Sequence, residues 1–180
     1  MTQPVSMKPL TTRSASAKPA STRPALLIDT NVWLDMEYGK RGGWPTEFLI
    51  AARVADARLG IASHSLKDVY YLLQRRIKLD DQRSGGVDPE RSATAARIAA
   101  WAVVEHILNT AEVVGSDYMD AYLATKQRRI HDDYEDDLII AAAMRMKADL
   151  LVTSDQILLK HAPIAALSPQ DAIHWLEMHQ

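Results

Sequence analysis

The 180-residue sequence contains no cysteine, and it has no long apolar run. Without cysteine, a disulfide framework, a catalytic thiolate and a zinc–thiolate site are excluded, and the composition fits a reducing compartment such as the cytoplasm. A transmembrane helix needs about 20 consecutive apolar residues, so we expect no membrane partner. The formal net charge is only −2, so no global basic field indicates a nucleic-acid partner. An anionic partner would have to be attracted by local charge or by bound metal.

Several motifs that carry chemistry are also absent. The sequence has no Gly-x-Ser-x-Gly, no Walker loop and no Gly-x-Gly-x-x-Gly, and its six histidines show no His-x-x-x-His or His-x-His spacing. These absences argue against a serine hydrolase, a P-loop nucleotidase, a dinucleotide-binding enzyme and a histidine metal centre.

Residues 1–24 have almost no large apolar side chain and no acid, and they carry four basic residues. Such a segment cannot offset its loss of conformational entropy by burial, so the sequence predicts a disordered N-terminal tail. The segment also lacks the apolar core of a secretory signal. Residues 25–180 are long enough for one domain with a full core.

Short apolar strands alternate with helical patterns along that domain. We expect strands at 25–29, 61–63, 112–114, 150–153 and 164–167. We expect helices at 32–38, 45–58, 89–108, 116–127 and 156–160, the fourth of them capped by Ser116. Three further helices are expected to be capped by Ser65, to start at 134 and to be capped by Ser168. Residues 80–88 read as a polar loop. This alternation predicts an α/β fold with a parallel sheet covered on both faces.

Four carboxylates lie near the ends of these elements. Asp29 and Asp155 end strands, Asp68 lies in the first turn of a helix that follows a strand, and Asp136 lies in the first turn of a helix that precedes one. In parallel sheets, sites form beyond the carboxyl ends of the strands. Converging carboxylates repel one another, and Mg²⁺ or Mn²⁺ suits such an all-oxygen site. Two such ions about 3.5–4 Å apart can hold the attacking water and the leaving oxygen of a phosphodiester.

Structural explanations compete with this one. Ser65-x-x-Asp68 resembles a helix capping box, and Asp155 after Thr153-Ser154 could simply start a helix. Acids in a first turn are also favoured by the helix dipole. Asp29 is harder to explain this way, because a charge directly after Leu-Leu-Ile needs a partner. The other acids of this region read as solvated or dipole-stabilising: Asp132, Asp133, Glu135 and Asp137.

Two basic runs accompany the acids. One comprises Arg75, Arg76, Lys78 and Arg83, and the other comprises Lys126, Arg128 and Arg129. Such runs are usually solvated faces, but these two could flank an anionic substrate.

Together these segments resemble the PIN-domain nucleases. Leu27-Ile28-Asp29-Thr30-Asn31-Val32 looks like the family's first strand with its leading aspartate. The segment 65–69 is similar to the one that carries the second acid, which is more often Glu in the family. Tyr134-Glu135-Asp136-Asp137-Leu138 with three alanines looks like the third-acid helix, and 151–155 looks like the strand that ends on the fourth acid.

This resemblance implies a three-layer α/β/α domain, Mg²⁺- or Mn²⁺-dependent cleavage of RNA, and a homodimer. Many small members are toxins of bacterial toxin–antitoxin pairs, which implies a cognate antitoxin as partner. By position, the metal-binding and catalytic acids would be Asp29, Asp68, Asp136 and Asp155, and Asn31 and Ser154 would support them or position water. Asp136 is preferred over Asp137 because it shares a helix face with Ile140 and Ala143, whereas neighbouring residues point about 100° apart.

Other functions remain open at this stage. The chain could be a PIN-type RNA-processing nuclease without an antitoxin, or a non-catalytic module that binds RNA or protein. A haloacid-dehalogenase-type phosphatase also begins with a strand and an aspartate, but it needs Asp-x-Asp, and Asn31 occupies the second position.

Overall fold

A five-stranded parallel sheet forms the centre of the computed structural model, which describes residues 23–39, 43–86, 88–128 and 132–179. Its strands are β1 (Ala25–Ile28), β2 (Arg58–Ala62), β3 (Glu112–Val114), β4 (Leu150–Val152) and β5 (Ala166–Leu167). They lie in the order β3-β2-β1-β4-β5, and every pair is parallel. The chain therefore adds strands on one side of β1, then returns to add β4 and β5 on the other.

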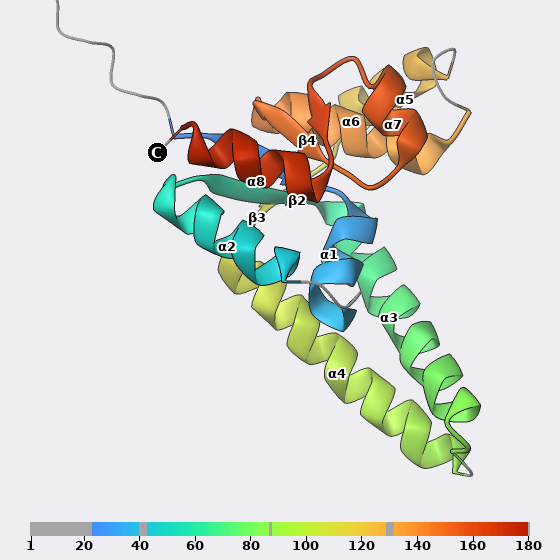
Figure 1. Ribbon diagram of the computed structural model, residues 1–180. Helices are drawn as coiled ribbons and strands as arrows, with labels where there is room; N and C mark the ends of the chain where they lie inside the picture. Colours follow the sequence, from blue (N-terminus) through green and yellow to red (C-terminus); the bar gives the residue numbers. More distant parts are fainter. Residues whose placement is uncertain (1–22, 40–42, 87, 129–131, 180) are drawn as a thin grey trace, which may run out of the picture.

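Helices cover both faces of this sheet (Figure 1). One face carries α1 (Thr30–Tyr38), α2 (Trp44–Val54) and α8 (Pro169–Glu177), and the other carries α6 (Tyr134–Met146) and α7 (Gln156–His161), with α5 (Tyr118–Gln127) packed on α6. Within β1, Leu26 and Ile28 enter the first core, whereas Ala25 and Leu27 enter the second. Successive strand residues point to opposite faces, so a strand buried on both sides is apolar throughout. The predicted three-layer α/β/α architecture with a parallel sheet is confirmed.

Two long helices pack side by side and extend away from the sheet (Figure 1). They are α3 (Ser63–Arg83) and α4 (Pro89–Thr110). The 21 residues of α3 span about 30 Å at 1.5 Å per residue. The expected polar loop at 80–88 was partly wrong, because helix α3 continues to Arg83. Residues 80–83 contain no helix breaker, and the chain turns only at Gly85, whose φ of 86° suits glycine.

The start of α3 also differs from the prediction. The helix begins at Ser63, directly after β2, and no side chain caps it. Ser65 is therefore inside the helix, where its hydroxyl is buried without a hydrogen-bond partner among the residues described. Asp68 consequently lies in the second turn, so both its predicted first-turn position and the capping-box explanation are wrong.

Two other caps can be compared with the sequence. The cap of α5 is Asp117 rather than Ser116: its side chain accepts a hydrogen bond from Met119 N at 2.7 Å, and its own N–H donates to Asp120 Oδ2 at 2.7 Å. Ser168 caps α8 as predicted, and its hydroxyl accepts from Asp171 N at 3.1 Å. No helix in the described part of the chain is both long and apolar enough to cross a membrane.

The predicted disordered tail falls mostly on residues 1–22, which lie outside the described residues. Its last two residues contact the domain. The carbonyl of buried Pro24 accepts a hydrogen bond from Arg58 N at 2.7 Å, and Arg23 pairs with Asp56 at 2.7 Å. Arg23 and Pro24 are thus held against the domain that was predicted to begin at Ala25.

Deletion of residues 1–22 should therefore leave the domain intact. We expect the thermal midpoint to stay within about 2 °C of the full-length value, because the composition of this segment cannot support a core. Calorimetry of the two proteins measures this. A loss of several degrees would show that the segment packs on the domain.

Candidate functional site

The candidate site lies where the strand order reverses, between β1 and β4. The N–H of Asp29 donates to Val152 O at 3.0 Å, so the ladder between the two strands continues one residue past β1. The residue that directly follows β4 adds a side-chain bond between the two strand ends, because Thr153 Oγ1 donates to Asp29 Oδ2 at 2.6 Å. In open α/β sheets such a switch point opens a crevice beyond the strand ends, and ligands bind there.

Asp29 is almost fully buried, with 3% of its surface exposed. Burial is the main cause that raises the pKa of its carboxyl group, and the nearby charge of Asp155 adds to it. The hydrogen bond from Thr153 acts in the opposite direction. The backbone N–H groups of Thr30 and Asn31 also lower the pKa, although Asp29 makes no side-chain capping bond to helix α1. Asp29 is therefore a carboxylate that the fold holds in place at an electrostatic cost.

Asp155 lies close to Asp29 and caps a helix. Its Oδ1 accepts hydrogen bonds from Ile157 N at 2.7 Å and Leu158 N at 3.0 Å at the start of α7. Its own N–H donates to Thr153 Oγ1 at 3.0 Å, so the Thr153 hydroxyl connects Asp29 and Asp155. The helix-start explanation of Asp155 thus holds, and the aspartate also adds negative charge next to Asp29.

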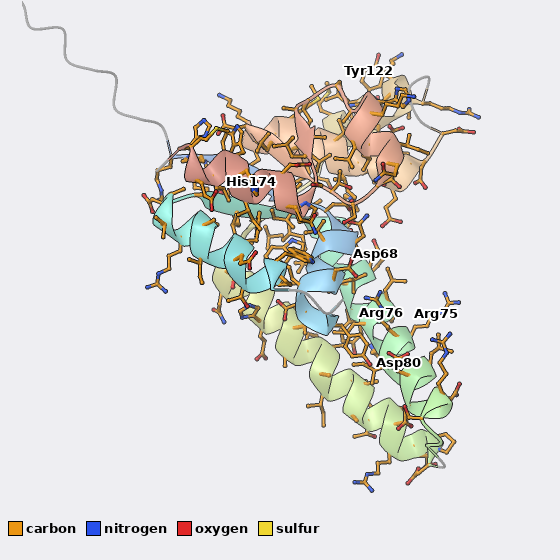
Figure 2. The ribbon with its side chains drawn as sticks, viewed as in Figure 1. Asp68, Arg75, Arg76, Asp80, Tyr122 and His174 are labelled. Atoms are coloured by element: carbon orange, nitrogen blue, oxygen red, sulfur yellow. The ribbon has the colours of Figure 1, made fainter. Side chains whose placement is uncertain are left out.

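Asp68 and Glu135 face each other across the site. Asp68 projects from α3 near the end of the helix that adjoins the sheet (Figure 2), and its side chain is 21% exposed. Although Glu135 is exposed as a whole, its carboxyl group is partly buried, and this burial raises its pKa. The charges of Asp68, Asp133 and Asp29 raise it further. Lys67 Nζ lies 3.2 Å from Asp68 Oδ1, but the lysine side chain is 67% exposed. It therefore offsets the negative charge of Asp68 only weakly.

Glu135 is the acid that the sequence reasoning missed. It shares the first turn of α6 with two other acids, Asp136 and Asp137, and the helix dipole favours an acid at any of these positions. Its approach to Asp68 and Asp29 depends on how α3 and α6 meet, and no local pattern reports this. Thr153 was missed as well, although a hydroxyl at the end of a buried strand, two residues before an aspartate, was an available signal.

Asp136 and Asp137 point to different cavities. Asp136 lines a small cavity of about 180 Å³ together with Asp29, Asn31 and Glu135. Asp137, which is 2% exposed, lines a separate cavity beneath α5 with residues such as Ala124 and Arg128. Neighbouring helix residues point about 100° apart, which accounts for this division. Of these two acids, only Asp136 borders the cavity of Asp29, and the preference for it as a metal ligand stays a prediction.

Asn31 and Ser154 connect the two loops of the site. The Asn31 Oδ1 accepts a hydrogen bond from Ser154 N at 3.4 Å, so the start of α1 is linked to the loop after β4. This contact is made by the backbone N–H of Ser154, and Ser154 as a whole is exposed. Both residues also line a larger cavity that adjoins the acidic one.

The donor set of the site is suited to a hard divalent cation. Asp29 and Glu135 both have raised pKa values in part because of neighbouring carboxylates, and a cation would relieve this repulsion. His64, at the start of α3, does not supply a positive charge, because burial lowers its pKa despite the nearby Asp68. Among the residues described, no three His, Asp or Glu side chains already stand in a metal-binding arrangement. The chemistry of the ligands therefore fits a cation, and their carboxylates would have to close around it.

Residues 25–156 match the family profile described as PIN domain. The chain belongs to the PIN domain family. A search against curated protein sequences finds no significant match. Among solved structures, the chain is similar to one in the crystal structure of VapBC2 from Rickettsia felis bound to a DNA fragment from their promoter. The two are 15% identical with a TM-score of 0.52, and the match covers 80% of this chain and 98% of that chain. This likeness confirms a PIN-like fold.

The burial of Asp29 predicts a stability gain on its neutralisation. Because its pKa is raised in the folded protein, ionisation costs folding free energy as the pH rises above the ordinary value of 3.8, and the cost is complete above the raised pKa. Asp29→Asn should therefore be more stable than wild type at pH 7, and the difference should shrink as the pH falls towards 3.8. Urea unfolding in EDTA at several pH values measures this.

Asp132→Asn is the matched control, because Asp132 is exposed and pairs with the exposed Arg128 on the surface. It should change stability little at any pH. An Asp29→Asn protein that is less stable than wild type at pH 7 would contradict the electrostatic account of the site.

Proposed function

We propose that this PIN domain is an Mg²⁺- or Mn²⁺-dependent endoribonuclease that hydrolyses RNA phosphodiesters. The observation that carries the proposal is the convergence of Asp29, Asp68, Glu135 and Asp136 at the switch point between β1 and β4, with Asp155 adjoining. PIN domains are in general nucleases that use divalent metals, which supports both the reaction and the cofactor. Carboxylates held close together repel one another and are otherwise costly for folding.

The acids would hold the cation, and their neighbours would hold the acids. Asp29 and Asp136 border one cavity, and Asp68, Glu135 and Asp155 lie around it. When bound, a divalent ion supplies a Lewis acid for the phosphodiester and lowers the pKa of water. Thr153 fixes the orientation of the Asp29 carboxylate, and Asn31 ties the start of α1 to the loop after β4. No protein nucleophile is needed, which agrees with the lack of a cysteine or serine motif.

We further propose that the protein acts in the cytoplasm as the toxin of a toxin–antitoxin pair. The fold likeness to a chain of VapBC2, a toxin–antitoxin complex, supports a protein partner. The exposed apolar side chains on α4 also favour one: Ile98 is 65% exposed, Trp101 57% and Leu108 51%. A second copy of the chain in a homodimer, or the antitoxin, would cover such a face. A basic antitoxin side chain would enter the acidic cavity and compete with metal.

Substitution of the acids should separate catalytic from structural carboxylates. Asp29→Asn keeps the size of the side chain and removes the charge that would hold the cation, so cleavage of a mixed RNA should fall by about 10³-fold or more. Asp155→Asn should behave similarly, and Glu135→Gln should also lower the rate. Asp137→Asn should be much milder, because Asp137 lines a different cavity. Initial rates with Mg²⁺ or Mn²⁺, and then with EDTA, measure this.

Thermal unfolding of each variant is the control, so that rates are compared between folded proteins. Asn is a good helix cap, so Asp155→Asn should keep helix α7. Cleavage that persists in EDTA would contradict the proposed mechanism. So would an Asp29→Asn variant that cleaves RNA at the wild-type rate.

Expression in the native host tests the toxin assignment. Wild-type protein alone should inhibit growth, Asp29→Asn should not, and co-expression of the adjacent small reading frame should restore growth. The inactive variant controls for the burden of expression. Harmless wild-type protein that nevertheless cuts RNA in vitro would favour an RNA-processing nuclease without an antitoxin.

A further inference from the structure

A second cavity adjoins the acidic one and is lined by arginines. It has a volume of about 510 Å³ and shares Asn31, Leu34 and Leu72 with the acidic cavity. Its basic residues are Arg75, Arg76 and Arg83, all from α3. Figure 2 shows Asp68, then Arg75 and Arg76, then Asp80 along this helix. The two cavities therefore form one continuous surface that changes from negative to positive.

The three arginines differ in how firmly they are held. Arg76 pairs with Asp35 at 3.5 Å and lies over the Tyr38 ring at 5.9 Å, so it forms a fixed wall of the cavity. Arg83 pairs with Asp80 at 3.5 Å, but its side chain is 77% exposed, so this pair is weak. Arg75 has no ion-pair partner within the part of the chain that the structure describes. Three guanidinium groups thus face only two carboxylates, and Arg75 keeps its donors available.

The second basic run, at residues 126–129, is less suited to bind an anion than the arginines of α3. Lys126 lies over the Tyr122 ring at 4.8 Å, and Arg128 pairs with Asp132 at 3.1 Å. Arg129 lies outside the described residues. This run borders the cavity of Asp137, not that of Asp29.

We propose that the arginine cavity binds a backbone phosphate of the RNA strand beside the one that is cut, with Arg75 and Arg83 as its ligands. This inference rests on the proposed function. An RNA strand carries a phosphate at every nucleotide, so a strand with one phosphate at the acids presents further phosphates to the adjoining surface. Arg presents a planar fork of donors that matches phosphate oxygens, and the apolar side chains of Leu34, Leu72 and Leu79 offer a surface for ribose or base.

The cavity also explains how a chain of net charge −2 binds a polyanion. The acids alone would repel RNA before metal is bound. Positive charge farther along α3 attracts the strand and holds it in register, beside the carboxylates rather than between them. The arginines therefore bind substrate, and the acids are left to hold the cation.

Salt-dependent binding of a single-stranded RNA in EDTA tests this without cleavage. Each lost phosphate contact lowers the slope of log Kd against log salt by about 0.7 for single strands. Arg75→Ala should show this change and lose about tenfold in affinity at low salt. Arg75→Lys should keep most of the slope while binding more weakly. Arg53→Ala is the matched control, because Arg53 is exposed and lies on α2, away from both cavities.

The outcomes separate this inference from the proposed function. If Arg75→Ala binds RNA like Arg53→Ala, or if the wild-type protein binds no RNA, the phosphate site is overturned. Equal competition by poly-glutamate would point to an acidic peptide and would also overturn it. If RNA binding depends on Arg75 but the protein does not cleave RNA, the phosphate site would be supported and the proposed nuclease function would be wrong.

In the cleavage assay, Arg75→Ala should raise KM and leave kcat nearly unchanged, because the contact is made equally in the ground state and the transition state. An equal fall of kcat and kcat/KM would instead show that Arg75 acts on the reacting phosphate, and would contradict a neighbouring-phosphate site.

Discussion

The hydrogen bond from Thr153 to Asp29 is the constraint on which the site depends. It joins the ends of two strands that are 124 residues apart in sequence, at the point where the order of the sheet reverses. The backbone bond from Asp29 N to Val152 O fixes the same register, so the ladder holds the backbone of Asp29 while Thr153 orients its carboxylate. A buried hydrogen-bonded carboxylate is tolerated in a core where an unpaired one would not be.

The burial of Asp29 makes the stability of the fold and the proposed binding of metal oppose each other. Burial raises the pKa of Asp29, and the charge of Asp155 raises it further, so the folded protein carries unfavourable electrostatic energy at neutral pH. Glu135 repeats this pattern beside Asp68. A bound cation would relieve this repulsion, because it would neutralise carboxylates that the fold brings near one another. The relief would add to the affinity for the cation.

Much of the fold could be predicted because its signals are local. The apolar run before Asp29 must be a strand buried on both faces, and Ser168 and Pro169 mark the start of a helix. The start of α3 could not be predicted, because Ser65 looked like a cap while the chain entered the helix two residues earlier, straight from β2. At the site, Asp29 is implied by its own neighbours. The approach of Glu135 to Asp68 depends on how two helices distant in sequence pack, and no short pattern records that.

The division of charge along α3 follows from this packing. Its first turns lie beside the sheet, where Asp68 meets the acids of α6, and its later turns leave the sheet with α4 and carry the arginines (Figure 2). Asp68 and Arg75 are seven residues apart, or about 10 Å along the helix axis, so the opposite charges could act on different parts of one ligand. At physiological salt, charges are screened over about 8 Å, so the arginines would act on an RNA strand bound next to them rather than cancel the field at the acids. This separation along the helix would let one small domain attract a polyanion and still keep the proposed site for cations.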